Sequence, residues 1–143
     1  SICLYSSIGF LDEKSNKKMF NNLFRSVKRG GRLIVDIMNP DWAIKNLNPH
    51  SEKVVFYKGN KYFIKHKRKI LYNPIREKNI IEFLDKQKMK KYMASYALRL
   101  YSRGELKEMF NQDNFKIIKS FGSFNKEKIA SSHQKIIIVA DKM

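Results

Sequence analysis

Two apolar runs separated by one amphipathic segment fill the N-terminal part of the chain. The first run begins at Ile2 and leads into a Ser-Ser-Ile-Gly turn, and the second lies in a predicted strand over residues 32–38. The second run, Leu33-Ile34-Val35, is continuous, as expected for a strand buried on both faces. The segment between the runs places its apolar residues on one helical face: Met19, Phe20, Leu23, Phe24 and Val27. The order of strand, helix and strand predicts one unit of a parallel α/β sheet.

The ends of this predicted helix carry capping signals. Ser15 suits the N-cap position, because a serine hydroxyl accepts a backbone N–H of the first turn. Lys28 and Arg29 are expected in the last turn, where cations complement the helix dipole. Gly30 and Gly31 then supply the left-handed backbone that ends a helix before the next strand.

Small and polar residues follow both predicted strands, at positions 5–9 and 36–39. Parallel sheets bind ligands at the carboxyl ends of their strands, so these residues are expected at a ligand-binding rim. If the first run is a central strand, its outer edge carries unpaired N–H and C=O groups that attract a partner. We therefore expect that the chain is a piece of a longer polypeptide, or that a partner chain or a homodimer covers this edge.

Over residues 52–98 the pattern changes to strand-length runs separated by turn residues. Several runs alternate between apolar and polar positions, which predicts an antiparallel sheet of about three or four strands. The runs cover residues 53–57, 61–71, 77–84 and 89–98. We expect this sheet to be an insertion, with residues 1–51 and 99–143 forming the α/β layer.

The C-terminal part predicts one helix and two strands. Ser102 and Glu105 form a capping-box pattern at the start of a short helix that ends near Asn111. Residues 115–121 and 135–140 have the composition of strands, and the long loop between them allows an antiparallel pairing.

Composition describes a basic chain. Lys and Arg number 30 against 13 Asp and Glu, giving a formal net charge of +17 over 143 residues. The cations are spread along the whole sequence, so a solvated basic surface and a phosphate-binding face both stay open. The single cysteine, Cys3, allows no disulfide within the chain, and no stretch approaches the ~20 apolar residues of a membrane span. These features favour a cytoplasmic location.

Metal and hydrolase chemistry have little support in the sequence. His50, His66 and His133 are scattered over different elements without the spacing of metal ligands, so no metal site is expected. Ser6 and Ser7 lack the Gly-x-Ser-x-Gly pattern of a nucleophilic serine at a sharp turn.

Four segments, taken in order, carry a resemblance to a known family. They are Cys-Leu-Tyr-Ser-Ser-Ile-Gly-Phe-Leu at 3–11, Lys-Arg-Gly-Gly at 28–31, Leu-Ile-Val-Asp at 33–36 followed by Asn39, and Arg-Leu-Tyr-Ser-Arg-Gly-Glu-Leu at 99–106. Together they resemble the C-terminal part of class I S-adenosylmethionine-dependent methyltransferases, and among these the small-molecule and sugar-amine N-methyltransferases. The resemblance implies an α/β fold, in which strands four to seven of the Rossmann-like methyltransferase sheet carry an inserted antiparallel β lid. The family's glycine-rich cofactor loop and acidic ribose-binding residue have no counterpart in this sequence.

The resemblance also implies S-adenosylmethionine as cofactor and methyl transfer to a nitrogen or oxygen of a small-molecule acceptor. Leu4, Tyr5, Ser6 and Ile8 are expected near the methionine part and the methyl group of the cofactor. Methyl transfer mainly requires that the nucleophile be aligned with the methyl carbon, so no catalytic residue is assigned.

Candidate substrate contacts follow the fifth strand or lie on the inserted sheet: Asn39, Tyr62, His66, Tyr72 and Arg99. Arg99 either pairs with a carboxylate or phosphate of the substrate or faces outward as a surface residue. Asp36 either positions a substrate amine or caps the end of its strand.

Two other function classes stay open. An RNA- or protein-directed methyltransferase would use the basic lid as its substrate face, and steeply salt-dependent RNA binding would favour it. A non-catalytic accessory chain or truncated fragment would explain the missing cofactor motifs, and tight binding of S-adenosylmethionine by this chain alone would exclude the accessory role.

Overall fold

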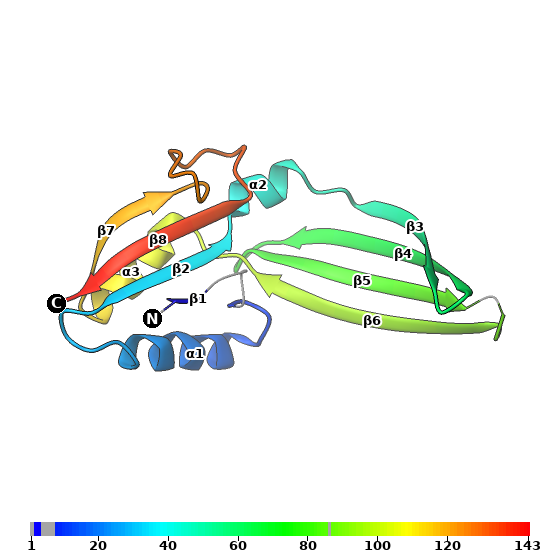
Figure 1. Ribbon diagram of the computed structural model, residues 1–143, viewed down its shortest axis with the longest axis horizontal. Helices are drawn as coiled ribbons and strands as arrows, with labels where there is room; N and C mark the ends of the chain where they lie inside the picture. The colour runs from blue at the N-terminus through cyan, green and yellow to red at the C-terminus, as the bar shows by residue number, and fades with distance from the viewer. Residues whose placement is uncertain (1, 4–7, 86) are drawn as a thin grey trace.

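A computed structural model describes residues 2–3, 8–85 and 87–143 of the chain. The strands form two four-stranded sheets, ordered β1-β2-β8-β7 and β3-β4-β5-β6. The second sheet extends away from the first, next to which helices α1 and α3 lie (Figure 1). In chain order the elements are β1 (Ile2–Cys3), α1 (Glu13–Arg25), β2 (Arg32–Met38), α2 (Pro40–Lys45), β3 (His50–Tyr57), β4 (Asn60–Leu71), β5 (Arg76–Asp85), β6 (Lys90–Arg99), α3 (Arg103–Gln112), β7 (Phe115–Phe121) and β8 (Lys135–Lys142).

The first sheet confirms the parallel unit predicted from the two apolar runs. β1 pairs in parallel with β2, with Ile2 opposite Ile34 and Cys3 opposite Val35. β8 runs antiparallel to β2 and to β7, so the last two strands form the expected antiparallel pair. The order of the four strands therefore confirms the α/β fold class.

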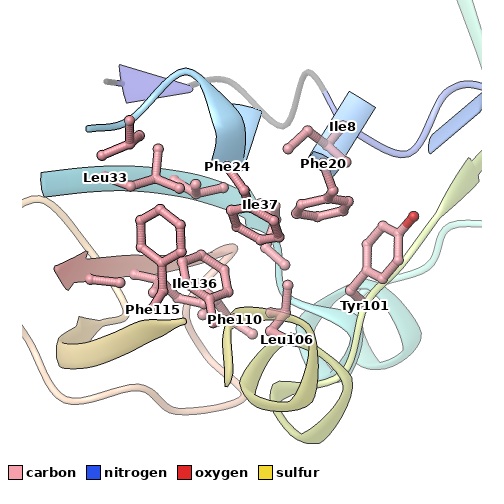
Figure 2. Close-up of a cluster of buried hydrophobic side chains, with 14 residues drawn as sticks. Ile8, Phe20, Phe24, Leu33, Ile37, Tyr101, Leu106, Phe110, Phe115 and Ile136 are labelled. Atoms are coloured by element: carbon pink, nitrogen blue, oxygen red, sulfur yellow. The ribbon is translucent and has the colours of Figure 1, made fainter. Parts of the chain in front are cut away.

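The hydrophobic core lies between α1, α3 and one face of the first sheet. β2 contributes alternate residues to this face, and Leu33 and Val35 are fully buried there. Aromatic rings fill the space beneath the helices, with the ring of Phe24 on α1 5.1 Å from those of Phe110 and Phe115 (Figure 2). Such rings bury large apolar areas and dominate core energetics.

The N-terminus of α1 differs from the prediction. Its N-cap is Asp12, whose carboxylate accepts the backbone N–H of Ser15 at 2.9 Å. Ser15 therefore lies in the first turn of the helix and does not cap it. Aspartate and serine are comparable N-caps, and the earlier of the two is the one that the chain uses.

The C-terminus of α1 also differs. The helix ends at Arg25 and is capped by Ser26, so Lys28 and Arg29 lie beyond its last turn. Gly30, with a φ of +73°, belongs to the turn that enters β2 and not to the helix end. The apolar position of Val27 extended the predicted helix too far, because this residue packs into the core from the turn.

α3 confirms the predicted capping box. The Ser102 hydroxyl accepts the backbone N–H of Glu105 at 3.2 Å, and the Glu105 carboxylate accepts that of Ser102 at 2.8 Å. The helix ends at Gln112, one residue beyond the predicted Asn111.

The second sheet confirms the predicted antiparallel sheet, since β3, β4, β5 and β6 pair successively in antiparallel. Because side chains alternate along a strand, the register sorts them onto two faces. The face that we call inner carries Ser51, Lys53, Val55, Tyr62, Ile64, His66, Arg68, Ile70, Glu77, Asn79, Ile81, Phe83, Asp85, Tyr92, Ala94, Tyr96 and Leu98. The opposite face, which we call outer, carries most of the lysines of the sheet.

Within residues 2–3, 8–85 and 87–143, no helix is long and apolar enough to cross a membrane. Over the same residues, no group of three or more His, Cys, Asp and Glu side chains is arranged to hold a metal ion.

Candidate functional site

The carboxyl ends of β1 and β2 lie side by side, because these strands are parallel neighbours. Ile8 and Gly9 belong to the connection after β1, and β2 leads through Asn39 into α2. Asn16 of α1, which is fully buried, holds the first connection in place. Its Oδ1 accepts the N–H of Gly9 at 3.2 Å, and its Nδ2 donates to the carbonyl of Leu11 at 2.7 Å.

The inner face of the second sheet meets this rim. The ring of Phe10, in the connection after β1, lies 5.7 Å from that of Tyr96 on β6. Leu98 of the same face is buried in a cluster against which Trp42 of α2 and Met38, at the end of β2, are packed. Figure 1 shows the base of the second sheet beside α2 and the end of β2. The inner face therefore lies next to the carboxyl ends of β1 and β2, where a ligand is expected.

The turn after β1 touches the last strand of the second sheet through Gly9. The backbone N–H of Arg99 donates to the Gly9 carbonyl at 2.8 Å. Gly9 has a φ of +116°, and a Cβ at this position would lie 2.5 Å from the carbonyl oxygen of Arg99. Only glycine fits here without displacing the strand.

Three of the predicted cofactor contacts, Leu4, Tyr5 and Ser6, lie outside the described residues. The fourth, Ile8, is only 2% exposed and belongs to the core cluster, where Figure 2 shows it near Phe20. Its side chain packs inward, which leaves its backbone as the part able to face a cofactor. The cofactor role of all four residues stays a prediction.

Two of the predicted substrate residues, Tyr62 and His66, share the inner face, whereas Tyr72 is exposed in the turn after β4. His66 donates from Nε2 to Oδ1 of Asn79 at 2.8 Å. The Tyr62 hydroxyl accepts from Asn60 Nδ2 at 3.4 Å. The structure thus places part of the predicted set on the face that meets the rim, and their contact with a substrate stays a prediction.

Asn39 is buried and engaged within the chain. Its Oδ1 accepts the N–H of Asp41 and caps α2, while its Nδ2 donates to the carbonyls of Ala130 and His133 at 3.0 and 2.9 Å. These bonds attach the loop before β8 to the end of β2. The geometry favours a structural role for Asn39 over substrate contact.

Arg99 is likewise engaged, at the end of β6, where its side chain is 7% exposed. Its Nε donates to Glu13 of α1 at 2.8 Å, and Nη2 donates to Glu105 of α3. Its Nη1 donates to the carbonyls of Ile75 and Leu100. The guanidinium therefore joins the second sheet to both helices, and it neither faces outward nor points to the inner face.

Asp36 takes neither of the two roles considered for it. Its carboxylate is fully buried within β2 and lies 2.7 Å from Nζ of Lys135 on β8. This ion pair crosses the two strands on the face of the first sheet opposite the helices, because Asp36 and Lys135 alternate with the core residues.

The Arg99 junction gives Glu105 an unusual acid–base property. Burial acts to raise its pKa, but hydrogen bonds from Ser102 and from Arg99 outweigh this and hold the pKa below the usual 4.5. A carboxylate whose folded-state pKa is lowered stabilises the fold above the unfolded-state pKa, and this contribution is lost as the pH falls through the folded-state value.

We therefore expect Glu105→Gln to lose less stability on acidification below about pH 4.5 than the wild type does, because the variant lacks this titrating group. Thermal unfolding followed at a series of pH values measures the difference. Glu108→Gln, on an exposed position of the same helix, should keep the wild-type acid profile. Parallel acid profiles for Glu105→Gln and the wild type would contradict the expectation.

Three residues of the site region were not predicted from the sequence: Asn16, Glu77 and Tyr96. Asn16 gives no signal in a helical pattern, since its role depends on the turn that packs against it. Glu77 and Tyr96 could have been found from alternation, because the strand register places them on the same face as Tyr62 and His66. Without the register, no pattern shows which face meets the rim.

The outer face holds most of the cations of the second sheet. Several are neutralised within it: Lys65 pairs with Glu52 at 3.0 Å, and Glu82 accepts two further lysines. Lys69 and Lys78 stand directly opposite each other, and no ion pair to either is formed from the described part of the chain. Like charges directly opposite each other in a sheet are destabilising, so this pair is expected to lower the stability of the second sheet.

Comparison with solved structures identifies the fold. The CcbJ methyltransferase from Streptomyces caelestis matches with a TM-score of 0.73 at 13% identity, covering 99% of this chain and 55% of its own. A S-adenosylmethionine-dependent methyltransferase from Clostridium acetobutylicum matches with a TM-score of 0.73 at 14% identity over 99% and 56%. CalS10, an amino pentose methyltransferase from Micromonospora echinaspora, matches with a TM-score of 0.66 at 13% identity over 99% and 57%.

The chain therefore has the Rossmann-like methyltransferase fold, with β1, β2, β7 and β8 in the places of strands four to seven. It spans only about half the length of these structures, with 55–57% of them covered. No protein-family model matches the chain, and no curated protein matches it significantly.

Proposed function

We propose that this chain is the C-terminal half of a S-adenosylmethionine-dependent methyltransferase that methylates a nitrogen or oxygen atom of a small molecule. The observation that carries the proposal is the meeting of the β1 and β2 carboxyl ends with the inner face of the second sheet, within a methyltransferase fold. The names of similar structures support it, since one is a S-adenosylmethionine-dependent methyltransferase and another an amino pentose methyltransferase.

S-adenosylmethionine, when bound, supplies an activated methyl group, so the chain has to position and enclose the acceptor. Leu4, Tyr5, Ser6 and the backbone of Ile8 are the proposed contacts to its methionine part. The second sheet, which extends from His50 to Arg99 and so includes the insertion predicted at 52–98, is the proposed substrate lid. Its inner face offers Ile81 and Phe83 as apolar surface and Tyr62 and His66 as polar groups for the acceptor.

We further propose that a segment of the same polypeptide or another chain covers the outer edge of β1. This strand ends the order of the first sheet, and Ile2 is 66% exposed there. Structures of similar fold are almost twice as long as this chain. A preceding segment of the same polypeptide, a partner chain or a homodimer would each supply the missing pairing.

Addition of S-adenosylmethionine to isotopically labelled chain is expected to shift NMR signals at the rim, in residues 8–11 and 39–45, because both segments follow the ligand-binding strand ends. Heteronuclear correlation spectra measure the shifts. Residues 115–121 at the far edge of the first sheet provide the internal control and should not move. Shifts confined to the outer face of the second sheet would contradict the proposal.

A second candidate, methylation of RNA with the basic lid as substrate face, is favoured by the opposed Lys69 and Lys78. Against it, the lysines around Glu52 and Glu82 are already paired, and the outer face does not look onto the rim. Binding of single-stranded RNA measured at several salt concentrations decides between the two. A steep salt dependence that Lys69→Gln and Lys78→Gln together reduce would support the RNA function.

A further inference from the structure

Glu77 is the one acidic side chain on β5 that is buried on the inner face close to the rim. It stands opposite Ile70 on β4 and Leu98 on β6, in the row of the inner face nearest the first sheet. The side chain of Leu98 reaches the Gly9 turn, since its Cδ1 would lie 3.0 Å from a Cβ on Gly9. The Leu98 side chain therefore lies between Glu77 and the connection that follows β1.

Among the described residues, the Glu77 carboxylate has no bonding partner. The residue is 8% exposed, and within residues 2–3, 8–85 and 87–143 its carboxylate forms neither a hydrogen bond nor an ion pair. Arg68, diagonally across on the inner face, instead donates Nε to the carbonyl of Asn48 at 3.1 Å. Asn79 donates to the backbone carbonyl of Glu77, which leaves the carboxylate unused. Buried carboxylates in proteins are normally paired, so this one is arranged for a cation that arrives from outside.

The groups around Glu77 complete a polar strip along the inner face. Next to its row, Tyr96 lies opposite Asn79, and Asn79 accepts from His66. Burial and the charge of Glu77 raise the pKa of the Tyr96 phenol, so it stays protonated and able to donate a hydrogen bond. The strip thus places the Glu77 carboxylate beside the neutral groups of Tyr96, Asn79 and His66, with the Arg68 cation diagonally across and the ring of Phe10 next to Tyr96.

Resting on the proposed function, we infer that Glu77 is a specificity-determining residue, which selects the acceptor by binding a cationic nitrogen. The ammonium group would bind to the carboxylate, and hydroxyl groups of the same molecule would bind to Tyr96, Asn79 and His66. A single carboxylate without further ligands suits an ammonium ion, which needs one strong acceptor, more than it suits a divalent metal. The strongly positive field of a chain with net charge +17 opposes cations in general, so selectivity for an amine has to come from a local carboxylate.

A matched pair of probes, D-glucosamine and D-glucose, tests this inference on the whole chain by NMR titration at about pH 6.5, below the ordinary amine pKa. The wild type is expected to bind glucosamine at least about tenfold more tightly than glucose, which is the lower end for a hydrogen bond to a charged group. Glu77→Gln should remove this preference. Glu82→Gln changes a carboxylate on the outer face of the same strand and should retain it.

Equal binding of the two probes by the wild type would overturn the inference, and this comparison does not depend on how any variant folds. A preference that persists in Glu77→Gln, or that also disappears in Glu82→Gln, would overturn it as well. Loss of S-adenosylmethionine binding in Glu77→Gln, with the glucosamine preference intact, would reassign the carboxylate to the cofactor. The proposed function fails separately, if the rim does not respond to S-adenosylmethionine while the amine preference remains.

Discussion

Arg99→Met is expected to lower the free energy of unfolding by about 3 kcal/mol, because it leaves two carboxylates and two carbonyls without their shared donor. The guanidinium bonds to Glu13 and Glu105 and to the carbonyls of Ile75 and Leu100. We place the loss at the low end of the range for a broken buried pair, since Glu13 and Glu105 are 49% and 39% exposed. Urea unfolding followed by circular dichroism measures it.

Arg29→Met is the matched control, because Arg29 is exposed and lies beyond the end of α1. A change within about 0.5 kcal/mol is expected for such a surface position. If Arg99→Met and Arg29→Met unfolded at the same urea concentration, the hydrogen bonds and ion pairs of Arg99 would contribute no more to stability than an exposed arginine does. The aromatic contact of Arg99 with Tyr101, at 4.6 Å, would then be equally unimportant.

This junction also shows the limit of what the sequence could predict. The bond between Glu13 and Arg99 joins residues 86 positions apart, and no local pattern announces such a pairing. Arg99 could be recognised as unusual among the lysine-rich segments, but its partners depend on how the second sheet docks onto α1 and α3. A substrate contact and an internal ion pair require the same residue type, so the sequence left both possible.

Features carried by local periodicity were predicted well. The continuous run at Leu33-Ile34-Val35, the alternating strands of the second sheet and the capping box at Ser102 all depend on residues within a few positions of each other. The ends of α1 were predicted less well, because Asp12 and Ser15 are both competent N-caps and their choice depends on packing.

The candidate site was predicted in part, for a geometric reason. Alternation along β4 shows that Tyr62 and His66 share a face, but the register with β5 is needed to add Glu77 and Asn79. Which face then meets the rim depends on the contact of Phe10 with Tyr96 and of Leu98 with the Gly9 turn. A site formed between two sheets thus depends on how the sheets pack against each other, and hydrophobic patterns in the sequence do not predict that packing.

Gly9→Ala is expected to cost at least about 1–3 kcal/mol of unfolding free energy from its backbone conformation alone, because a φ of +116° is strained for any L-residue with a side chain. Further loss should follow from displacement of the turn, since the new Cβ would lie 2.5 Å from the carbonyl oxygen of Arg99. The hydrogen bond from the Arg99 N–H to the Gly9 carbonyl would weaken with it. Urea unfolding measures the total.

Gly59→Ala separates the cost of the backbone conformation from the cost of the steric clash. Gly59, between β3 and β4, also has a positive φ, of +75°, but a Cβ there meets nothing within 4 Å. It should therefore show the conformational cost without the steric one, and Gly9→Ala should be clearly the more destabilised variant. Gly9→Ala should also lose the response of residues 39–45 to S-adenosylmethionine, because the turn lies between the rim and the inner face, whereas Gly59→Ala should retain it. Equal effects of the two substitutions on stability and on this response would mean that the turn after β1 does not fix the second sheet over the rim.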